Sequence, residues 1–297
     1  MTSRSLAPGL ARLTSFAEQV GPADLVTVSG LGTRGGPVPD ARVVAAPVGI
    51  DWIQPAEMTV SVGAGTPVDE LDAALQLHGQ RVALPPGGTV GGALAAGRSG
   101  IRRLGDGPVR DAVLQVRYVS AAGEVVKGGG PTVKNVSGFD LPRLLVGSRG
   151  TLGFLGDVIL RTWPRSRCER WYAGAVDPDD VVARLYRPVS VLWDGATTWV
   201  LLEGDERDVE AQAGVLGLHE VDGPPPLPTG GRWSVPPDQV RSITGTFVAE
   251  VGVGVVHHVE PAPPRTVDPA ILDLHLRLKE RFDPTGRLNP GIDPLTP

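Results

Sequence analysis

The stretch of sequence that decides the fold runs from Gly128 to Pro164 and reads GGGPTVKNVSGFDLPRLLVGSRGTLGFLGDVILRTWP. It holds three glycine-rich loops around a short amphipathic segment, and Gly147, Gly150 and Gly153 lie three residues apart. Glycine permits left-handed backbone conformations and lets N–H groups approach an anion closely. The stretch therefore predicts one wall of a phosphate- or dinucleotide-binding site.

The same stretch predicts a helix followed by a strand. Residues 139–146 place leucines on one face at helical spacing, with Asp140 as the N-cap and Pro142 in the first turn. Residues 154–163 then alternate as a β-strand until Pro164 ends it. The helix would support the glycine loop, and the strand would lead away from the site.

A second glycine loop lies between Gly30 and Gly35, where GLGTRG follows a short β-rich run. The spacing matches the GxGxxG fingerprint of dinucleotide-binding Rossmann domains, which needs a helix to begin at the last glycine. Pro37 and Pro39 follow instead, so we reject a Rossmann domain and keep the loop. A plain surface loop is the alternative.

A third glycine loop has the sequence PPGGTVGG at residues 85–92, and its glycine pairs around Thr89 are expected to expose backbone donors to an anion. Tight helix packing is the alternative use of such small residues. Upstream, Thr66, Pro67 and Asp69 have the pattern of an N-cap, a first-turn proline and an acidic third position. They predict a helix that begins at Pro67.

Five short sequence motifs, taken together, resemble those of one family. VKNVSGFDL, LLVGSRGTLG, AGTPVDEL, TVGGALAAG and GPVRDAVL occur between Thr59 and Pro164. Their order is similar to that of the FAD-binding domain of FAD-linked oxidases, the PCMH-type or vanillyl-alcohol-oxidase-like group. Within that group the chain is most similar to the small FAD-binding E subunit of bacterial glycolate oxidase. The ending KERFDPTGRLNPG also resembles the C-terminal tail of this family.

The resemblance implies an α+β fold with three parts. Residues 1–165 would form a PCMH-type FAD-binding domain of two α/β subdomains, and residues 263–297 a C-terminal helix and tail that return to it. Residues 166–262 would form a ferredoxin-like cap. The pattern of the chain agrees with such a cap, because strand, helix, strand, strand, helix and strand follow in turn from Trp171. We expect residues 247–259 to return as a strand.

The resemblance also implies non-covalently held FAD and a set of cofactor-binding residues. Covalent attachment has no support, because residues 30–35 and 89–100 contain neither histidine nor cysteine. Arg110 and Asp111 would support the site, unless they only pair with each other. Lys134 would neutralise phosphate or a reduced, anionic flavin, unless it is a solvated surface lysine. The complete set is Gly30, Leu31, Gly32, Thr33, Arg34, Gly35, Pro86, Gly88, Thr89, Val90, Gly91, Gly92, Ala95, Ala96, Gly97, Arg110, Asp111, Lys134, Asn135, Ser137, Gly138, Asp140, Gly150, Thr151, Leu152 and Gly153.

Oxidation of a 2-hydroxy acid needs a base near the hydroxyl and a cation for the carboxylate. The candidates are His257, with His258 beside it, and Arg232. The sequence GVGVVH has the same spacing as the GDGNxH motif of the family's larger catalytic subunits. Val253 and Val255 stand where that motif has aspartate and asparagine. One packed and one exposed histidine on a strand is the structural alternative.

Composition limits the other possibilities. The 297 residues are enough for two domains, and the single Cys168 leaves no cluster for an iron–sulfur centre or structural zinc. We expect no metal site, no nucleic-acid role at a net charge of -5, and no membrane span, because no run of about 18 apolar residues occurs. The expected location is cytoplasmic, with peripheral attachment at the inner face of the membrane through partners left open.

Three functions follow from this reading. The leading one is an FAD-binding subunit of a glycolate- or 2-hydroxyacid-oxidising complex, with a larger flavoprotein subunit and an iron–sulfur subunit as partners. The second is a stand-alone FAD-dependent oxidoreductase that acts on a small 2-hydroxy acid with His257 or His258 as base and Arg232 as the carboxylate-binding residue. The third is a structural subunit that has lost FAD, which the intact glycine loops argue against.

Overall fold

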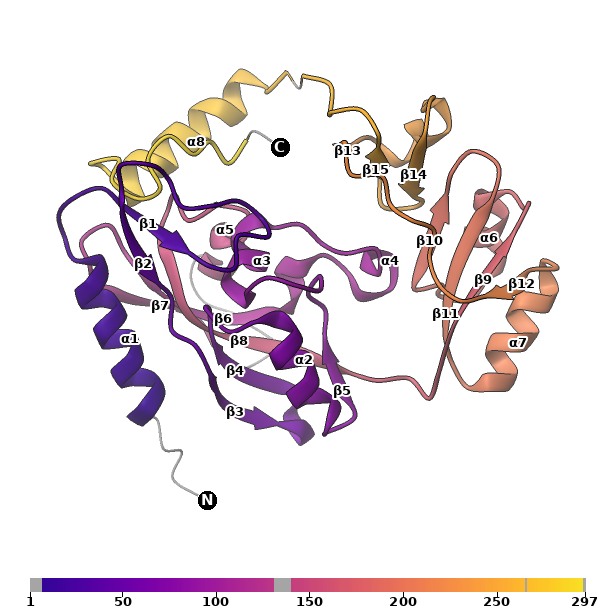
Figure 1. Ribbon diagram of the computed structural model, residues 1–297, viewed down its shortest axis with the longest axis horizontal. Coiled ribbons are helices and arrows are strands. Elements are labelled where there is room, and N and C mark those ends of the chain that lie inside the picture. The colour runs from indigo at the N-terminus through magenta and orange to yellow at the C-terminus, as the bar shows by residue number, and fades with distance from the viewer. Residues whose placement is uncertain (1–6, 131–139, 265, 296–297) are drawn as a thin grey trace. The chain divides into compact units, whose positions relative to one another are not determined.

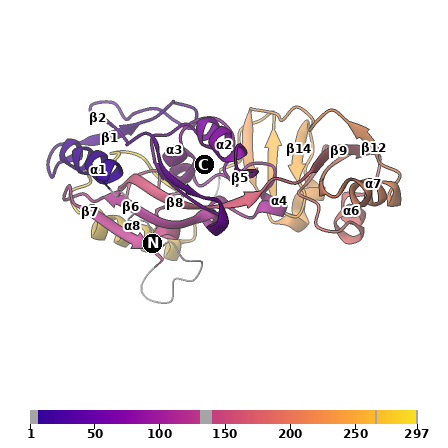
Figure 2. The same ribbon diagram turned by 90° about the horizontal axis from the view of Figure 1, so that it is seen from below.

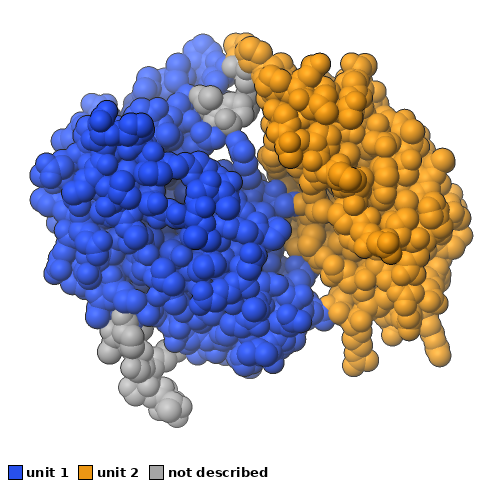
Figure 3. All heavy atoms as spheres, viewed as in Figure 1, with its two compact units in different colours: residues 1–100, 108–165, 267–296 blue, residues 101–107, 166–266, 297 orange. Residues whose placement is uncertain are grey.

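The computed structural model describes residues 7–130, 140–264 and 266–295, and it divides the chain into two units (Figure 3). Unit 1 consists of Met1–Gly100, Pro108–Arg165 and Val267–Thr296. Unit 2 consists of Ile101–Gly107 and Ser166–Thr266. The second unit is therefore an insertion in the first, with a short additional segment contributed from residues 101–107.

Strand β8 (Phe154–Pro164) is the centre of unit 1 (Figures 1 and 2). It pairs antiparallel with β4 (Thr59–Gly63) on one side and with β6 (Val113–Val119) on the other. β3 (Ile50–Gln54) and β7 (Val125–Gly129) form the edges, and β5 (Gln80–Val82) pairs with the end of β8. The stretch that opens the sequence analysis therefore supplies the middle of the main sheet.

The predicted strand at residues 154–163 is confirmed, and both of its faces are buried over most of its length. The first seven residues of β8 are all buried, including Phe154 and Val158 on one face and Leu155 and Ile159 on the other. Asp157 on that face is buried too, and its carboxylate accepts a hydrogen bond from Arg117 at 2.7 Å. Both faces of the sheet are covered at this strand, and period-2 alternation does not occur where both faces are buried.

Among its described residues, unit 1 has five α-helices: α1 (Ala7–Val20), α2 (Val68–Gln76), α3 (Val90–Ala96), α5 (Leu141–Leu145) and α8 (Pro269–Phe282). The predicted cap of α5 is confirmed, because Asp140 accepts from the Arg143 amide at 3.2 Å. The predicted cap of α2 is wrong. Thr66 accepts instead from the Gly49 amide at 2.8 Å, and the helix begins after Pro67.

A two-stranded parallel sheet of β1 (Val26–Ser29) and β2 (Arg42–Ala45) completes unit 1. The C-terminal tail runs beside β1, since Val26 donates to the Arg287 carbonyl at 3.0 Å and Asn289 donates to the Val26 carbonyl at 2.9 Å. The buried Arg287 guanidinium donates to the carbonyls of Val20, Gly21, Ala23, Asp24 and Ala121. These bonds fix the tail to the start of the chain.

Unit 2 contains one antiparallel sheet with the strand order β12-β9-β11-β10-β14-β15-β13. Its first four strands alternate with two helices along the chain, and residues of both helices share one core cluster with the strands, so both cover one face. This arrangement is consistent with the ferredoxin-like cap. The elements are β9 (Cys168–Gly174), α6 (Pro178–Arg184), β10 (Ser190–Trp193), β11 (Thr198–Gly204), α7 (Glu206–Val215), β12 (His219–Val221), β13 (Gly231–Ser234), β14 (Phe247–Glu250), β15 (Val255–His258) and the short α4 (Arg103–Asp106).

The single strand expected at residues 247–259 is wrong. The structure has a hairpin there, in which β14 and β15 are joined by a turn that contains Gly252 and Gly254, both at a φ of 76°. Glycine adopts this left-handed conformation without steric cost, so the two glycines allow the chain to reverse. The three remaining short segments are 3-10 helices: η1 (Pro55–Glu57), η2 (Val109–Ala112) and η3 (Pro237–Ser242).

No helix in the part of the chain that the structure describes is both long and apolar enough to span a bilayer.

Candidate functional site

A cleft of about 290 Å³ lies in unit 1, and every residue that lines it belongs to that unit. Its walls come from three segments far apart in the sequence: the loop after β1, helix α3 with the residue that precedes it, and the turn between α5 and β8. The tail adds Asn289 and Ile292. The structure thus brings the three glycine-rich segments into one concave surface.

The loop after β1 provides unused backbone donors. Within the described residues, the N–H groups of Leu31, Gly32 and Gly36 donate to no protein acceptor. Gly32 has a φ of +72° and Gly35 a φ of +117°, and a Cβ at either position would meet nothing within 4 Å. These two glycines are therefore required by backbone conformation and not by packing. The loop can offer amides to an anion in the cleft.

The loop before α3 differs from this expectation. The Val90, Gly91 and Gly92 amides donate to the Thr66 carbonyl at 2.9 Å, the Ala64 carbonyl at 2.7 Å and the Thr89 hydroxyl at 3.0 Å. We expected exposed donors here, and the prediction is wrong for these three amides because the fold already uses them. A Cβ on Gly91 would lie 2.9 Å from both the Cβ and the carbonyl oxygen of Ala64. The small residues let α3 pack closely behind the cleft.

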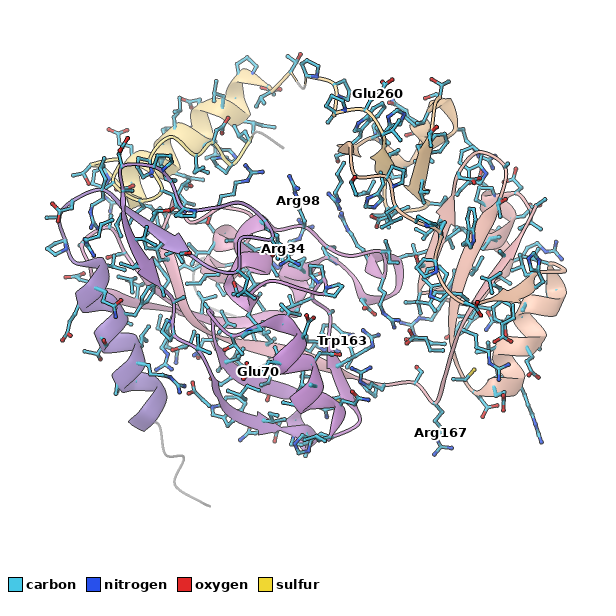
Figure 4. The ribbon with its side chains drawn as sticks, in the orientation of Figure 1. Arg34, Glu70, Arg98, Trp163, Arg167 and Glu260 are labelled. Atoms are coloured by element: carbon cyan, nitrogen blue, oxygen red, sulfur yellow. The ribbon has the colours of Figure 1, made fainter. Side chains whose placement is uncertain are left out.

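Arg34 connects these two loops (Figure 4). Its guanidinium donates to the carbonyls of Pro85 at 3.2 Å, Pro86 at 3.0 Å and Gly87 at 2.8 Å. Burial lowers the pKa of Arg34, and the nearby Asp69 carboxylate partly opposes this shift. Arg34 lines the cleft, but its donors are directed at protein carbonyls, so its main role is to hold the second loop against the first.

The turn between α5 and β8 packs against the end of α3. Gly147 donates to the Leu94 carbonyl at 3.0 Å, and Arg149 donates to the Ala95 carbonyl at 2.9 Å. The Asn289 side chain donates to the Arg149 carbonyl at 2.6 Å, while its buried Oδ1 has no hydrogen-bond partner among the described residues. The tail therefore holds this turn in place, and Asn289 leaves one acceptor unused at the cleft.

Thirteen of the predicted cofactor-binding residues line the cleft. They come from all three glycine-rich segments, and none of them is acidic. They are Gly30, Leu31, Gly32, Thr33, Arg34, Gly35, Thr89, Gly91, Gly92, Ala95, Ala96, Gly150 and Gly153.

The other predicted residues lie behind or away from the cleft. Pro86, Gly88, Val90 and Gly97 support the second loop and α3, and Thr151 and Leu152 are buried behind the third segment. Arg110, Asp111 and Asp140 are exposed, and Asp111 and Asp140 both pair with Arg143, at 3.0 Å and 3.3 Å. Lys134, Asn135, Ser137 and Gly138 lie outside the described residues.

Sequence reasoning identified Arg34 but missed the other two arginines that line the cleft. Arg98, two residues beyond the end of α3, and Arg149 both line it. Burial lowers the pKa of Arg98, and the charge of Arg149 lowers it further, so the two guanidinium groups are close enough to repel each other. The short sequences GRSG and SRGT contain these two arginines. The arginines are about 50 positions apart, and only the folded chain brings them together.

The two candidate catalytic residues belong to unit 2. His257 on β15 lies opposite Arg232 on β13, and its Nε2 is 2.9 Å from Oε1 of Glu250. The Glu250 side chain is 2% exposed and its Oε2 has no hydrogen-bond partner among the described residues. His258 points to the opposite face, where it stacks on Trp233. His257 therefore has a carboxylate partner that could orient its ring and accept its proton.

The cleft fits FAD on chemical grounds. Its described lining contains three arginines and no aspartate or glutamate, together with free amides and an apolar side built from Val28, Val38, Phe154 and Leu155. A diphosphate requires donors and cations, and flat ring systems require apolar surface. No group of three or more metal-ligating side chains occurs within the described residues.

Comparisons with known proteins agree with this chemistry. Residues 26–129 match the FAD binding domain family. The chain is 36% identical over 188 residues to the glycolate oxidase subunit GlcE of Escherichia coli, which covers 59% of this chain and 53% of that protein. It is 37% identical over 144 residues to a D-lactate dehydrogenase of Archaeoglobus fulgidus, which covers 46% of this chain and 32% of that one.

A third relative is the glycolate oxidase subunit GlcD of Bacillus subtilis, 31% identical over 145 residues, or 46% of this chain and 31% of that protein. Among solved structures, an alkyldihydroxyacetonephosphate synthase aligns with a TM-score of 0.66 at 14% identity, over 97% of this chain and 75% of that one. The chain spans between about a third and about half of the length of these curated relatives. The FAD-binding domain and the mixed helix-and-sheet fold predicted from the sequence are confirmed.

Proposed function

From the FAD-binding domain that this chain carries over residues 26–129, we propose that it is the FAD-binding subunit of a flavoprotein complex that oxidises glycolate or another 2-hydroxy acid. Its FAD would take part in electron transfer inside the complex. The proposal assigns the cofactor to the cleft of unit 1. Unit 2 would be the cap, and the C-terminal helix and tail would return to the FAD-binding domain.

One observation carries this proposal: the cleft combines unused amides in the first loop with three arginines and no carboxylate. The 30–36 loop and the arginines would hold the anionic part of FAD, and the small residues Ala95 and Ala96 would allow α3 to lie close to a flat ring. When bound, FAD supplies the hydride and electron chemistry itself, while the protein orients it and excludes water.

Non-covalent attachment is part of the proposal. Covalent flavin links need a nucleophilic side chain, and the described residues that line the cleft include no histidine, cysteine or tyrosine. The one cysteine, Cys168, is buried in unit 2. Denaturation in acid should therefore release all of the flavin into the supernatant, and yellow colour retained on the precipitated chain would contradict this.

The partners are proposed by analogy with the relatives, two of which are described as subunits of glycolate oxidase. A larger flavoprotein subunit would meet the substrate, and an iron–sulfur subunit would carry electrons onward, because this chain has no cysteine cluster of its own. We place the complex in the cytoplasm, with attachment to the membrane only through partner chains, and cell fractionation tests this location.

Purification of the native protein under mild conditions tests the function. We expect a flavin absorption spectrum with two bands, co-purification of two further chains, and glycolate-dependent reduction of a dye acceptor by the complex. The isolated chain should bind FAD but reduce the dye slowly or not at all. Robust turnover by the isolated chain would overturn the subunit role.

A second candidate is supported by the pairing of His257 with Glu250 and its place opposite Arg232. In a stand-alone oxidoreductase, His257 would take the hydroxyl proton while Glu250 stabilises the imidazolium, and Arg232 would bind the carboxylate. His257→Asn would then abolish turnover by the isolated chain. In the subunit role, the same variant should leave FAD binding unchanged and affect unit 2 alone.

The third candidate, a structural subunit without FAD, predicts a colourless protein that takes up no flavin after refolding. The free amides and the arginines gathered at one concave surface argue against it, because these are the groups that bind an anion.

A further inference from the structure

Helix α8, drawn in yellow in Figure 1, contributes no buried residue to unit 1. In its N-terminal part (residues 269–276), the side chains of Ile271, Leu272, Leu274 and Leu276 are 45% to 60% exposed. Single exposed apolar side chains are normal on a protein surface, but a contiguous group of them marks an interaction site. The N-terminal part of α8 therefore has the composition of a contact surface.

Hydrogen bonds hold α8 to the rest of unit 1 at its C-terminal end. The Lys279 ammonium donates to the Thr151 carbonyl at 2.8 Å and to the Leu288 carbonyl at 3.2 Å, and Phe282 packs against the main core. Within the described residues, no hydrogen bond or ion pair joins residues 269–276 to a residue beyond the helix and its N-cap. The fold thus holds one end of the helix and leaves the apolar part exposed.

The apolar surface covers more than half of the circumference of this part of the helix. At about 100° per residue, the arc from Leu274 through Ile271 to Leu276 spans about 200°, with one histidine as its polar residue. Asp273 and Arg277 form the opposite edge and pair with each other at 2.9 Å. A helix that packs on one side needs an apolar stripe of only about 100°, so this arc fits a groove with two walls.

The charge and the size of this surface favour a protein groove over other occupants. A helix that lies on a membrane carries lysine or arginine along its polar face, whereas the paired edge of Asp273 and Arg277 has no net charge. Two copies of this chain joined through α8 alone would cover one side of each helix and bury far less than the roughly 800 Å² per partner of a stable interface. A larger partner can enclose the helix and extend onto the surface beside it.

We propose that the N-terminal part of α8 inserts into an apolar groove of the larger flavoprotein subunit. The inference rests on the proposed function, which supplies this partner, and it adds the surface through which the two chains meet. Apolar grooves recognise amphipathic helices through side chains at i, i+3, i+4 and i+7, the spacing present here. Because the anchored end of α8 bonds the Thr151 carbonyl, directly behind the third glycine-rich segment, the partner would lie next to a wall of the cofactor cleft.

Labelling of an introduced thiol tests whether the partner covers this surface. Cys168 is the single native cysteine and is buried, so a cysteine placed on α8 would be the accessible thiol. We would compare Leu276→Cys, on the apolar arc, with Arg277→Cys, the matched control on the polar edge, by their rates of reaction with a fluorescent maleimide. Both should react freely in the isolated chain. The purified larger flavoprotein subunit should slow the reaction of Leu276→Cys at least about tenfold and that of Arg277→Cys less than about twofold.

A second pair of variants tests the apolar contact itself. The double variant Leu272→Glu with Leu276→Glu should bind the larger flavoprotein subunit at least about tenfold more weakly, because the groove would desolvate two charges. The control, Asp273→Asn with Arg277→Gln, should bind within about twofold of wild type. Both should bind FAD as wild type does, because no residue of α8 is among the described residues that line the cleft. Unchanged FAD binding would also show that the variants are folded.

Other outcomes would overturn the inference. Slow labelling of Leu276→Cys in the isolated chain would mean that the chain covers its own helix or, if the rate falls as protein concentration rises, that a second copy does. Protection by the iron–sulfur subunit alone, or by phospholipid vesicles, would identify a different occupant. If the double glutamate variant binds the larger subunit as wild type does, α8 is not the interface and the subunit role stands. If wild type binds no larger flavoprotein subunit, the proposed function fails and the inference fails with it.

Discussion

Two glycine-rich segments line the same cleft and use glycine in opposite ways. In the loop after β1, the amides of Leu31, Gly32 and Gly36 are unused, and a Cβ on Gly32 would enter open space. In the segment that leads into α3, the amides of Val90 and Gly91 are already bonded inside the protein. The first segment can donate to a ligand, and the second makes room for one.

This difference teaches that glycine content alone does not identify a donor loop. After Thr89, Gly91 is needed because Ala64 lies directly against it, whereas Gly87 and Gly88 before Thr89 have left-handed backbones with a φ of +72° and +68°. The glycines at 32 and 35 are needed because their backbone is left-handed. The two loops also depend on each other, since Arg34 of the first bonds three carbonyls of the second. Substitutions that separate packing from conformation can test the distinction.

Gly97→Ala should have the largest effect on stability. Gly97 has a φ of +65° and Gly32 a φ of +72°, so an alanine carries a similar backbone strain of about 1 kcal/mol at both sites. At Gly97 the new methyl group would also lie 2.8 Å from the Gly147 Cα, and overpacking of this kind costs about 2 kcal/mol more. Chemical denaturation should show a loss of about 3 kcal/mol for Gly97→Ala and about 1 kcal/mol for Gly32→Ala. Equal losses would show that packing does not distinguish Gly97, at the C-terminal end of α3, from Gly32.

Arg34→Gln should come next, because it removes the link between the two loops. Three carbonyls of residues 85–87 would lose a charged donor, and since the site is partly exposed we expect a loss of about 1.5 kcal/mol in the free energy of unfolding. Arg34→Lys keeps the charge but not the forked geometry, so it should recover only part of the loss. Limited proteolysis should then cut first near Pro86. A variant as stable as wild type would show that the two loops are independent.

Much of the fold could be predicted from local patterns. Helix α5 with its Asp140 cap and strand β8 both follow from short-range rules, and both are present. The predictions that are wrong involve partners distant in sequence. Thr66 has the sequence of a cap but bonds the Gly49 backbone, and residues 247–259 are rich in valine on both sides of Gly252 and Gly254, which conceals the turn between the two strands.

The candidate site was predictable in part for the same reason. The glycine-rich sequence motifs indicate which segments line the cleft, and 13 of the predicted cofactor-binding residues line it. Which amides remain free could not be predicted, because it depends on acceptors such as the Ala64 carbonyl. The pairing of Arg98 with Arg149 could not be predicted either, because no short-range rule connects α3 with the turn before β8.

Thr89→Val should cause the smallest of the three losses in the free energy of unfolding. It tests the role of the segment before α3 through a single hydrogen bond. The Thr89 hydroxyl accepts from the Gly92 amide at 3.0 Å and caps α3, so its loss should cost about 1 kcal/mol. Thr89→Ser keeps the hydroxyl and should stay within about 0.5 kcal/mol of wild type. If the segment only makes room for the ligand, FAD affinity should fall little in Thr89→Val, because the freed Gly92 amide lies on a helix whose position is also held by the Val90 and Gly91 bonds. A loss of FAD affinity of about tenfold or more would mean that this amide contacts the cofactor, and the division between a donor loop and a packing loop would not hold.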